Sequence, residues 1–256
     1  MYKVIFPEAN NEYIKTAAAQ LTNLCEPVLL DCDLQTAAVK VLDGEADAMI
    51  AGIDCSSRDV ILATRDVIGV PEGKKTFSSL FVAKFPDGRK IILSDGATCK
   101  NPTSEQLADI IELAHDAAAK ILDEQPRVAV LSFSTFGSGG KDPSMDKTAE
   151  AIAMIRDRRA DILVDGEMQL DAAVNSRVGE KKAAAHGGSD VAGRANVLIV
   201  PDINSGNILY KSIEQFAGAT VAGPILLGFA KPVSDLSRGS TVEDVILTAE
   251  SLIRLI

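Results

Sequence analysis

Short β-favouring runs alternate with longer helical segments from the start of this chain. The β-favouring runs span residues 2–6, 27–30 and 46–51, and the helical segments between them span 12–24 and 36–42. One face of the first helical segment carries the apolar residues Ile14, Ala17, Ala18 and Leu21. Strands separated by helices pair in parallel, with the helices covering the sheet. This order of elements predicts an α/β protein built on a parallel sheet.

The pattern changes after residue 73. Two apolar, β-favouring runs, 78–85 and 90–94, are joined by Pro86-Asp87-Gly88-Arg89, a sequence typical of a tight turn. Such a pair predicts an antiparallel hairpin within an otherwise parallel pattern. We therefore expect a change of domain near residues 73–78.

The rest of the chain continues to alternate strands and helices. The clearest helix spans 103–122, where Thr103 and Gln106 have the spacing of a capping box and His115 lies beside the apolar stripe. We interpret His115 as a structural residue. Further strands are predicted at 127–132, 161–164, 196–200 and 224–228, further helices at 147–158, 170–178, 205–217 and 241–256, and a polar surface loop at 180–193.

The balance of charge argues against several classes of partner. The 256 residues include 26 Lys and Arg against 36 Asp and Glu, which gives a formal net charge of −10. Nucleic acids and anionic membrane surfaces attract basic faces, so we expect neither as a partner. No apolar run is long enough to span a membrane, and the first residues lack the pattern of a signal peptide.

Cysteine and histidine usage argues against a metal site. The 4 cysteines show no CxxC spacing, and the chain has only 2 histidines. A zinc site built from these residue types is therefore not expected. Reduced thiols in a cytoplasmic protein are the simplest interpretation.

Two loops that follow predicted strands have compositions suited to anions. The segment 132–140 combines hydroxyls with glycines, so that several backbone N–H groups can converge on an anion at the end of a strand. The segment 201–207 precedes a helix that carries Lys211, and a helix N-terminus favours phosphate. A surface turn in the first case and ordinary N-capping in the second explain the same residues without a ligand.

Two further loops are equally ambiguous when each is taken alone. The segment 231–240 contains Arg238-Gly239, which an ordinary turn would explain, and Asp244 follows Thr241 at the spacing of a capping box. The segment 164–171 carries acidic residues after a predicted strand.

Taken together, these loops resemble one family. The segments 131–135, 165–173, 191–196, 201–207 and 231–239 are similar, in order and approximate spacing, to those of the phosphate acetyltransferase/phosphate butyryltransferase family. The resemblance runs from about Ala46 to the C-terminus, and the segment 4–9 is similar to the start of that family.

The resemblance implies a fold and an assembly. It implies a two-domain, three-layer α/β/α fold like that of isocitrate and isopropylmalate dehydrogenases, with the active site in the cleft between the domains. The first domain is expected to comprise residues 1–75 and 232–256, and the second residues 76–231, including the hairpin. The family usually forms homodimers, so we expect a homodimer here.

The resemblance also implies a reaction, the reversible transfer of an acyl group between coenzyme A and inorganic phosphate. Acyl-CoA, phosphate and acyl phosphate would then be substrates, and no permanently bound cofactor or metal is expected. By motif, Asp244 corresponds to the base that takes the thiol proton, Arg238 to the group that holds the acyl phosphate, and Ser237 to a hydrogen-bonding partner of the reacting groups. We place a phosphate cradle, from its chemistry alone, at Ser134, Thr135, Gly137, Ser138, Asn204 and Lys211.

The chain departs from the family in two respects. It is shorter, because the segment 28–32 passes almost directly into the segment 33–52, where the family usually has an additional helix and strand. The arginine with which the family contacts CoA phosphates falls at Ile61 or Leu62, and Arg58 and Arg65 lie about one helical turn to either side. Compensation by Arg58 or Arg65 is one interpretation. The alternative is a non-catalytic or regulatory relative that binds CoA or phosphate.

Overall fold

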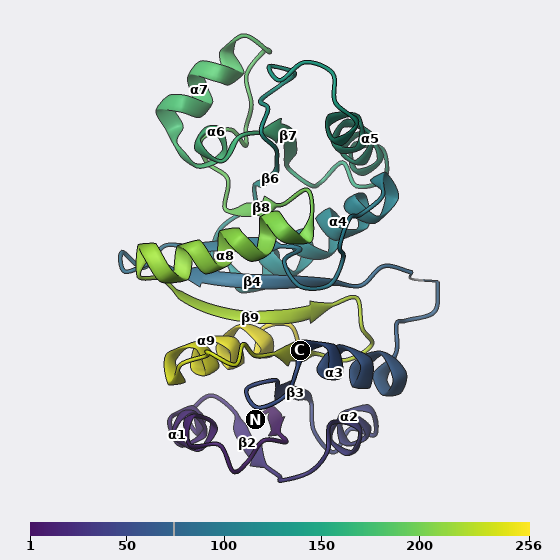
Figure 1. The fold of residues 1–256 in the computed structure, drawn as a ribbon, viewed down its shortest axis with the longest axis vertical. Coiled ribbons are helices and arrows are strands. Elements are labelled where there is room, and N and C mark those ends of the chain that lie inside the picture. The colour runs from purple at the N-terminus through teal and green to yellow at the C-terminus, as the bar shows by residue number, and fades with distance from the viewer. Residues whose placement is uncertain (74) are drawn as a thin grey trace. The chain divides into compact units, whose positions relative to one another are not determined.

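The computed structural model describes residues 1–73 and 75–256, which form two compact units (Figure 1). Unit 1 comprises Met1–Pro86 and Ile213–Ile256, and unit 2 comprises Asp87–Ser212. Both units combine strands with helices, which confirms the predicted α/β class. The expected change of domain near 73–78 includes Lys74, which lies outside the described residues.

Unit 1 is built on a mixed sheet with the strand order β2-β1-β3-β10-β9-β4. The bounds are β1 Lys3–Phe6, β2 Glu26–Leu29, β3 Ala48–Ala51, β4 Ser78–Lys84, β9 Thr220–Leu227 and β10 Val233–Asp235. The strands β2, β1, β3 and β10 are parallel to one another, as the alternating pattern predicts, whereas β9 is antiparallel to β10 and to β4.

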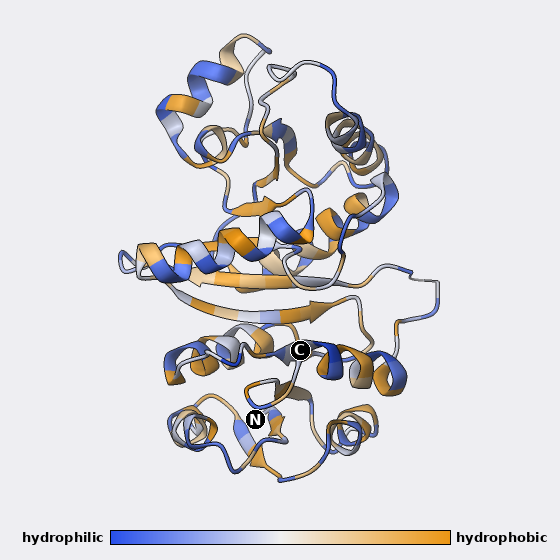
Figure 2. Cartoon of the chain, viewed as in Figure 1, coloured by the Kyte–Doolittle hydropathy of each residue, from blue (hydrophilic) through white to orange (hydrophobic). Residues whose placement is uncertain are grey.

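The helices of unit 1 form two groups beside its sheet. Their bounds are α1 Glu12–Leu21, α2 Leu34–Leu42, α3 Ser57–Ala63, the π-helical turn η1 Thr64–Ile68 and α9 Val242–Ile253. The helix α1 packs against α9, and α2 packs against α3 and η1 (Figure 1). The four apolar residues predicted on the inner face of α1 are all buried. Figure 2 shows the apolar residues concentrated on the strands and on the inner faces of these helices.

Long-range pairing extends unit 1 beyond the segments assigned to the first domain. The strands β4 and β9 pair with each other, and both fall within the range 76–231 that was assigned to the second domain. However, β9 also pairs with β10, which falls within the range assigned to the first domain. Local sequence patterns do not report such non-local partners. The strand β10 was not predicted, because its three residues are too few to show a period.

Unit 2 is built on a wholly parallel sheet with the strand order β5-β8-β6-β7. The strand bounds are β5 Lys90–Ser94, β6 Val128–Leu131, β7 Val164–Met168 and β8 Val197–Ile199, and the helix bounds are α4 Ser104–Ile121, α5 Pro143–Arg158, α6 Leu170–Val174, α7 Ser176–Ala184 and α8 Ile203–Ala217. The capping box predicted for α4 is present, with Gln106 accepting from the Thr103 N–H at 3.0 Å.

Several predictions in unit 2 were wrong in their bounds, among them the helix predicted at 147–158, which begins at Pro143. The strand predicted at 161–164 instead spans Val164–Met168, and within it Gly166, with a φ of +147°, lies too close to Val130 for any side chain. The helix predicted at 170–178 breaks at Asn175, whose side chain caps α7 by accepting from the Val178 N–H at 3.3 Å. The loop predicted at 180–193 is helical up to Ala184.

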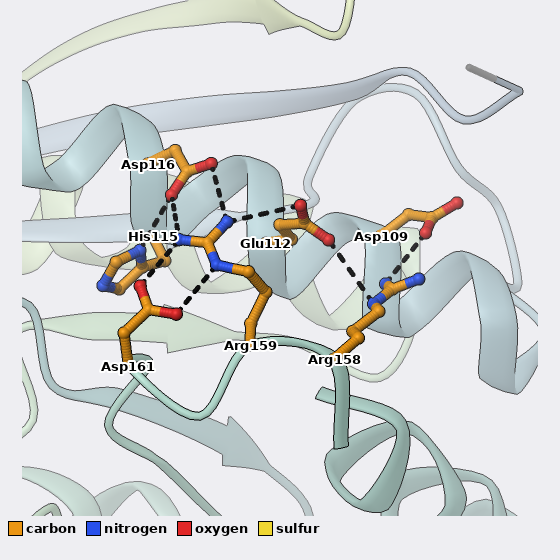
Figure 3. Close-up of polar contacts among 7 residues, drawn as sticks. All are labelled: Asp109, Glu112, His115, Asp116, Arg158, Arg159 and Asp161. Carbon is orange, nitrogen blue, oxygen red and sulfur yellow. Dashed lines mark hydrogen bonds and ion pairs between the residues drawn. The ribbon is translucent and has the colours of Figure 1, made fainter. Parts of the chain in front are cut away.

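An ionic network joins α4 to the end of α5 (Figure 3). Arg159 donates to both carboxylate oxygens of Asp116 and of Asp161 over 2.8–3.2 Å, and it also contacts Glu112. His115 shares the Asp116 carboxylate at a distance of 3.0 Å, in keeping with the structural role inferred for this histidine. The Arg159 hydrogen bonds hold the pKa of Asp161 down to about 2. Burial acts to raise the pKa of Asp116, but hydrogen bonds from Arg159 and His115 hold it below its ordinary value.

Replacing Arg159 with alanine is expected to lower the melting temperature by a few degrees near neutral pH, because the network is only partly exposed to solvent. The folded pKa of Asp161 lies below its unfolded value, so the stabilisation is present above about pH 4 and is lost as pH falls toward about 2. Thermal unfolding of the variant and the parent at several pH values measures this difference.

Lys15→Ala is the control, since Lys15 forms an isolated exposed pair with Glu12. A loss for Arg159→Ala that is the same at low and neutral pH would mean that packing of the arginine stem, and not its charge, stabilises the protein.

Candidate active site

A cavity of about 430 Å³ lies at the carboxyl edge of the unit 2 sheet. It is bounded by the loops after β6 and β8 and by the first turns of α5 and α8. Its lining residues are Leu131, Ser132, Phe133, Ser144, Thr148, Leu170, Val200, Pro201, Asp202, Ser205 and Leu209. This edge is where parallel α/β sheets bind ligands, so the cavity is a candidate site for a substrate group.

Two of the helices that reach the cavity, α5 and α8, are capped by carboxylates. Asp202 accepts from the Ser205 N–H at 2.9 Å, and Asp142 accepts from the Ser144 N–H at 2.8 Å. These carboxylates satisfy the N–H groups that a bound phosphate would otherwise use. Among the described residues that line the cavity, none is cationic. The cavity is therefore suited to an uncharged group that can contact hydroxyls and apolar side chains.

The predicted glycine-rich cradle is arranged around Glu167, a residue that the sequence analysis did not single out. Ser134 Oγ and the Gly137 N–H both donate to Glu167 Oε1, at 2.8 and 2.7 Å, and Glu167 is only 7% exposed. The Thr135 N–H donates to Ser138 Oγ at 3.0 Å. The chain's own carboxylate thus occupies part of this predicted phosphate cradle. Glu167 lies within the family-like segment 165–173, but only the fold reveals its partners.

The two cradle residues on α8 differ in their surroundings from those of the loop. Asn204 and Lys211 are both exposed, and Lys211 Nζ lies 4.8 Å from the centroid of the Tyr210 ring. A second lysine that the sequence analysis missed, Lys147 on α5, donates to the Pro201 carbonyl at 3.1 Å. Lys147 thereby holds the loop after β8 in place.

The loop after β10 in unit 1 presents a free arginine. Ser237 is partly exposed, and its Oγ accepts from the Gly239 N–H at 3.3 Å. Arg238 is exposed, and within the described part of the chain its guanidinium makes no hydrogen bond or ion pair. Its five donors therefore remain available for an anion.

Asp244 begins α9 as part of a real capping box. Its Oδ2 accepts from the Thr241 N–H and from Thr241 Oγ1, both at 2.8 Å, and its Oδ1 accepts from the Val221 N–H at 3.1 Å. The residue is 5% exposed. The structural interpretation of Asp244 is thus correct, and its role as a base stays a prediction.

The two arginines offered in place of the family's CoA-contacting arginine are not equivalent. Arg58, in the first turn of α3, is exposed and forms no hydrogen bond or ion pair with any residue in the described ranges. Arg65 is held by Asp66, with an Nη2 to Oδ1 distance of 2.7 Å. An anion must therefore compete with Asp66 for Arg65 but not for Arg58.

The predicted site residues are divided between the two units. Ser237, Arg238, Asp244, Arg58 and Arg65 belong to unit 1, and the cradle residues on the glycine-rich loop and α8 belong to unit 2. The predicted placement of the active site in a cleft between domains stays a prediction.

Two searches of the described residues were negative. Across 1–73 and 75–256, no group of three or more His, Cys, Asp or Glu side chains is arranged to hold a metal ion. Over the same ranges, no helix combines the length and the apolar character needed to cross a membrane.

Comparison with known proteins points to one family. A family model described as phosphate acetyl/butaryl transferase matches residues 28–251. The phosphate acetyltransferase of Treponema pallidum is 43% identical over 220 residues, which cover 83% of this chain. The chain spans only 65% of that relative's length and 64% of the length of the phosphate acetyltransferase of Clostridium acetobutylicum.

Solved structures agree with the sequence comparison. A phosphotransacetylase from Streptococcus pyogenes superposes with a TM-score of 0.83 at 32% identity, covering 98% of this chain and 94% of that one. A 4-hydroxythreonine-4-phosphate dehydrogenase from Klebsiella pneumoniae superposes with a TM-score of 0.50 at 16% identity, covering 86% of this chain and 66% of that one. The second likeness concerns the fold alone, and it agrees with the predicted dehydrogenase-like architecture.

Proposed function

This chain belongs to the phosphate acetyl/butaryl transferase family, and from that premise we propose that it transfers an acyl group reversibly between coenzyme A and inorganic phosphate. The observation that carries the proposal is the intact Ser237-Arg238 loop with an unpaired guanidinium, followed by Asp244. The similarity to relatives named phosphate acetyltransferase favours acetyl as the acyl group.

The reaction needs three tasks, and the chain has a residue for each. Asp244 takes the proton from the CoA thiol, because the thiolate is the nucleophile. The sulfur then attacks the carbonyl carbon of the acyl phosphate, the bond from that carbon to the phosphate oxygen breaks, and inorganic phosphate leaves. Arg238 holds the phosphate and offsets the charge that develops on the oxygens, and Ser237 donates a hydrogen bond to the reacting groups. No acyl-enzyme is required, since two bound substrates react directly.

The remaining groups bind the rest of the substrates. We assign CoA phosphates to Arg58, whose guanidinium is free, in preference to Arg65. The cavity in unit 2, with its hydroxyls, its apolar wall and its single carboxylate, suits an uncharged part of the substrate. Asn204 and Lys211, both exposed on α8, are the cradle residues that remain available to phosphate.

The chain is also proposed to act as a cytoplasmic homodimer. Ile208 and Phe216, both on α8, are 66% and 89% exposed. Large apolar side chains in such positions are typical of surfaces that a partner covers. A cytoplasmic location fits substrates that carry CoA.

Turnover is expected when the chain is incubated with acetyl-CoA and phosphate, measured as release of the CoA thiol, with propionyl-CoA and butyryl-CoA as alternative substrates. Asp244→Asn should then lower kcat by about 100-fold or more, the usual contribution of a positioned base. Absence of turnover by the parent protein with all three acyl-CoA substrates would reject the proposed function.

Thr241→Ala is the matched control for Asp244→Asn. It removes two of the hydrogen bonds of the capping box but keeps the carboxylate. Both variants should lose about 1 kcal/mol of stability, the typical value of a helix cap. If Thr241→Ala loses as much activity as Asp244→Asn, Asp244 acts through the structure of α9 and not as a base.

Removal of Arg58 is expected to raise the KM for CoA about tenfold with little change in kcat, because this side chain contributes binding in the ground and transition states alike. Arg65→Ala, about two turns further on, should leave the KM within about twofold, since Asp66 already holds Arg65. Steady-state kinetics at fixed ionic strength measure both values. Equal effects of the two substitutions would contradict the assignment.

Phe216→Glu is expected to shift the protein from dimer to monomer at micromolar concentration, because it places a charge at an exposed apolar position on α8. Light scattering coupled to size-exclusion chromatography measures the mass. Gln20→Glu, an exposed position on α1, is the control for charge alone. An unchanged mass for Phe216→Glu would show that this surface of α8 does not join two copies.

A further inference from the structure

Asp235 ends β10, two residues before Ser237, and its carboxyl group is buried without a hydrogen bond of ordinary geometry. The residue is 0% exposed, and neither oxygen has a hydrogen-bond partner of ordinary geometry among the described residues. Glu8, at the same edge of the unit 1 sheet, instead accepts from three backbone N–H groups of the segment 52–54, over 2.8–3.1 Å. A buried polar group without partners costs free energy, so its presence requires an explanation.

The Asp235 side chain is packed tightly against the end of β3. A Cβ atom at Gly52 would lie 2.2 Å from Asp235 Oδ1, and Gly52 has a φ of +111°, so only glycine fits there. Beside this contact, the Leu236 N–H donates to the Ala51 carbonyl at 2.6 Å. The chain leaving this contact on one side leads to Arg58, and on the other side to Arg238. Asp235 therefore lies where the two segments that carry free arginines meet.

The surroundings of Asp235 disfavour a negative charge. Burial raises its pKa to about 7, the Ser57 hydroxyl opposes this, and the Glu8 carboxylate reinforces it. Cys55 lies in the same group of side chains, and burial together with the charges of Glu8 and Asp235 raises its pKa to about 12.

The elements packed against β10 supply few other charges. The ranges of β3 and β9, the strands on either side, contain no titratable side chain. The helix α3 carries Arg58 and Asp59, and α9 carries Glu243, Asp244 and Glu250. Asp244 is already engaged by Thr241 and Val221.

We propose that Asp235 is a positioning residue that works as a neutral carboxylic acid, packing on Gly52 to set the Ser237–Arg238 loop against the segment leading to Arg58. The proposal rests on the proposed function, because it assigns these two arginines to the anionic groups of the substrates. A neutral acid fills the contact with Gly52 without placing a negative charge near Arg238 and Arg58. Ionisation of Asp235 would offset the positive potential that attracts phosphate.

Asp235→Asn tests the charge state without any need for turnover. The folded pKa lies above the unfolded value of about 3.9, so the parent loses stability relative to the neutral variant as pH rises from about 4 to about 7. The melting temperature of Asp235→Asn should therefore exceed that of the parent at about pH 8, and the excess should shrink toward about pH 5. Asp54→Asn, which removes an exposed carboxylate at the same edge, should show no such trend.

Kinetics and phosphate binding test the positioning. Asp235→Asn should keep kcat within about twofold of the parent, whereas Asp235→Ala, which leaves a gap on Gly52, should lower kcat/KM about tenfold or more. The KM for phosphate should rise in the parent, relative to Asp235→Asn, as pH rises above about 7. Dividing the KM of the parent by the KM of Asp235→Asn at each pH cancels the effect of the ionisation of phosphate itself. The increase in melting temperature that inorganic phosphate gives the full chain should likewise become smaller in the parent than in Asp235→Asn as pH rises above about 7.

The outcomes separate the two proposals. Asp235 is not a neutral positioning acid if the melting temperature of Asp235→Asn, relative to the parent, shows as little pH dependence as that of Asp54→Asn. The same conclusion follows if Asp235→Asn loses as much activity as Asp235→Ala. If the parent shows no turnover, the proposed function fails, and the phosphate-dependent melting temperatures then decide the role of Asp235. Equal stabilisation by phosphate of the parent, Asp235→Asn and Asp235→Ala at every pH would overturn the proposal.

Discussion

The carboxyl edge of each parallel set of strands is the constraint on which the proposed chemistry depends. Parallel strands joined by helices all end at the same edge, so the loops that follow them gather there. In unit 1 this edge carries the segment after β3 and the Ser237–Arg238 loop after β10, and in unit 2 it carries the loops that bound the cavity. Residues far apart in sequence thus become neighbours without any long side chain having to reach across the fold.

At these edges, the chain's own carboxylates take the place of external anions. Glu8, Asp95, Glu167 and Asp202 each accept from backbone N–H groups of a strand-end loop or a helix start. Each such bond fixes a loop that would otherwise bind solvent or an anion. A net charge of −10 is therefore compatible with anionic substrates. The local field around the unpaired arginines, and not the net charge of the chain, governs the binding of a small anion.

Periodicity and capping made much of the fold predictable, because both are local. The buried face of α1 and the capping box at Thr103 were read from spacing alone. The pairing of β4 with β9 depends on contacts between distant segments, and β10 is too short to have a detectable pattern. For the site, motifs predicted roles for Arg238 and Asp244, and these roles stay predictions. The motifs could not reveal Glu167 as the partner of the glycine-rich loop or the burial of Asp235, since both arise from long-range packing.

Two buried carboxyl groups flank the Ser237–Arg238 loop in sequence, and counting their lone pairs supports the proposal that Asp244, and not Asp235, acts as the base. A carboxylate offers about four acceptor positions. Asp244 uses three of them, on Thr241 N–H, Thr241 Oγ1 and Val221 N–H, so it is held in a fixed orientation with one position left for a thiol proton. Asp235 has unused positions, but it is enclosed against Gly52 with no exposed surface, so no substrate atom reaches it. Access, and not the mere presence of a carboxyl, therefore favours Asp244 as the proposed base, and it agrees with the proposal that Asp235 acts through packing and charge.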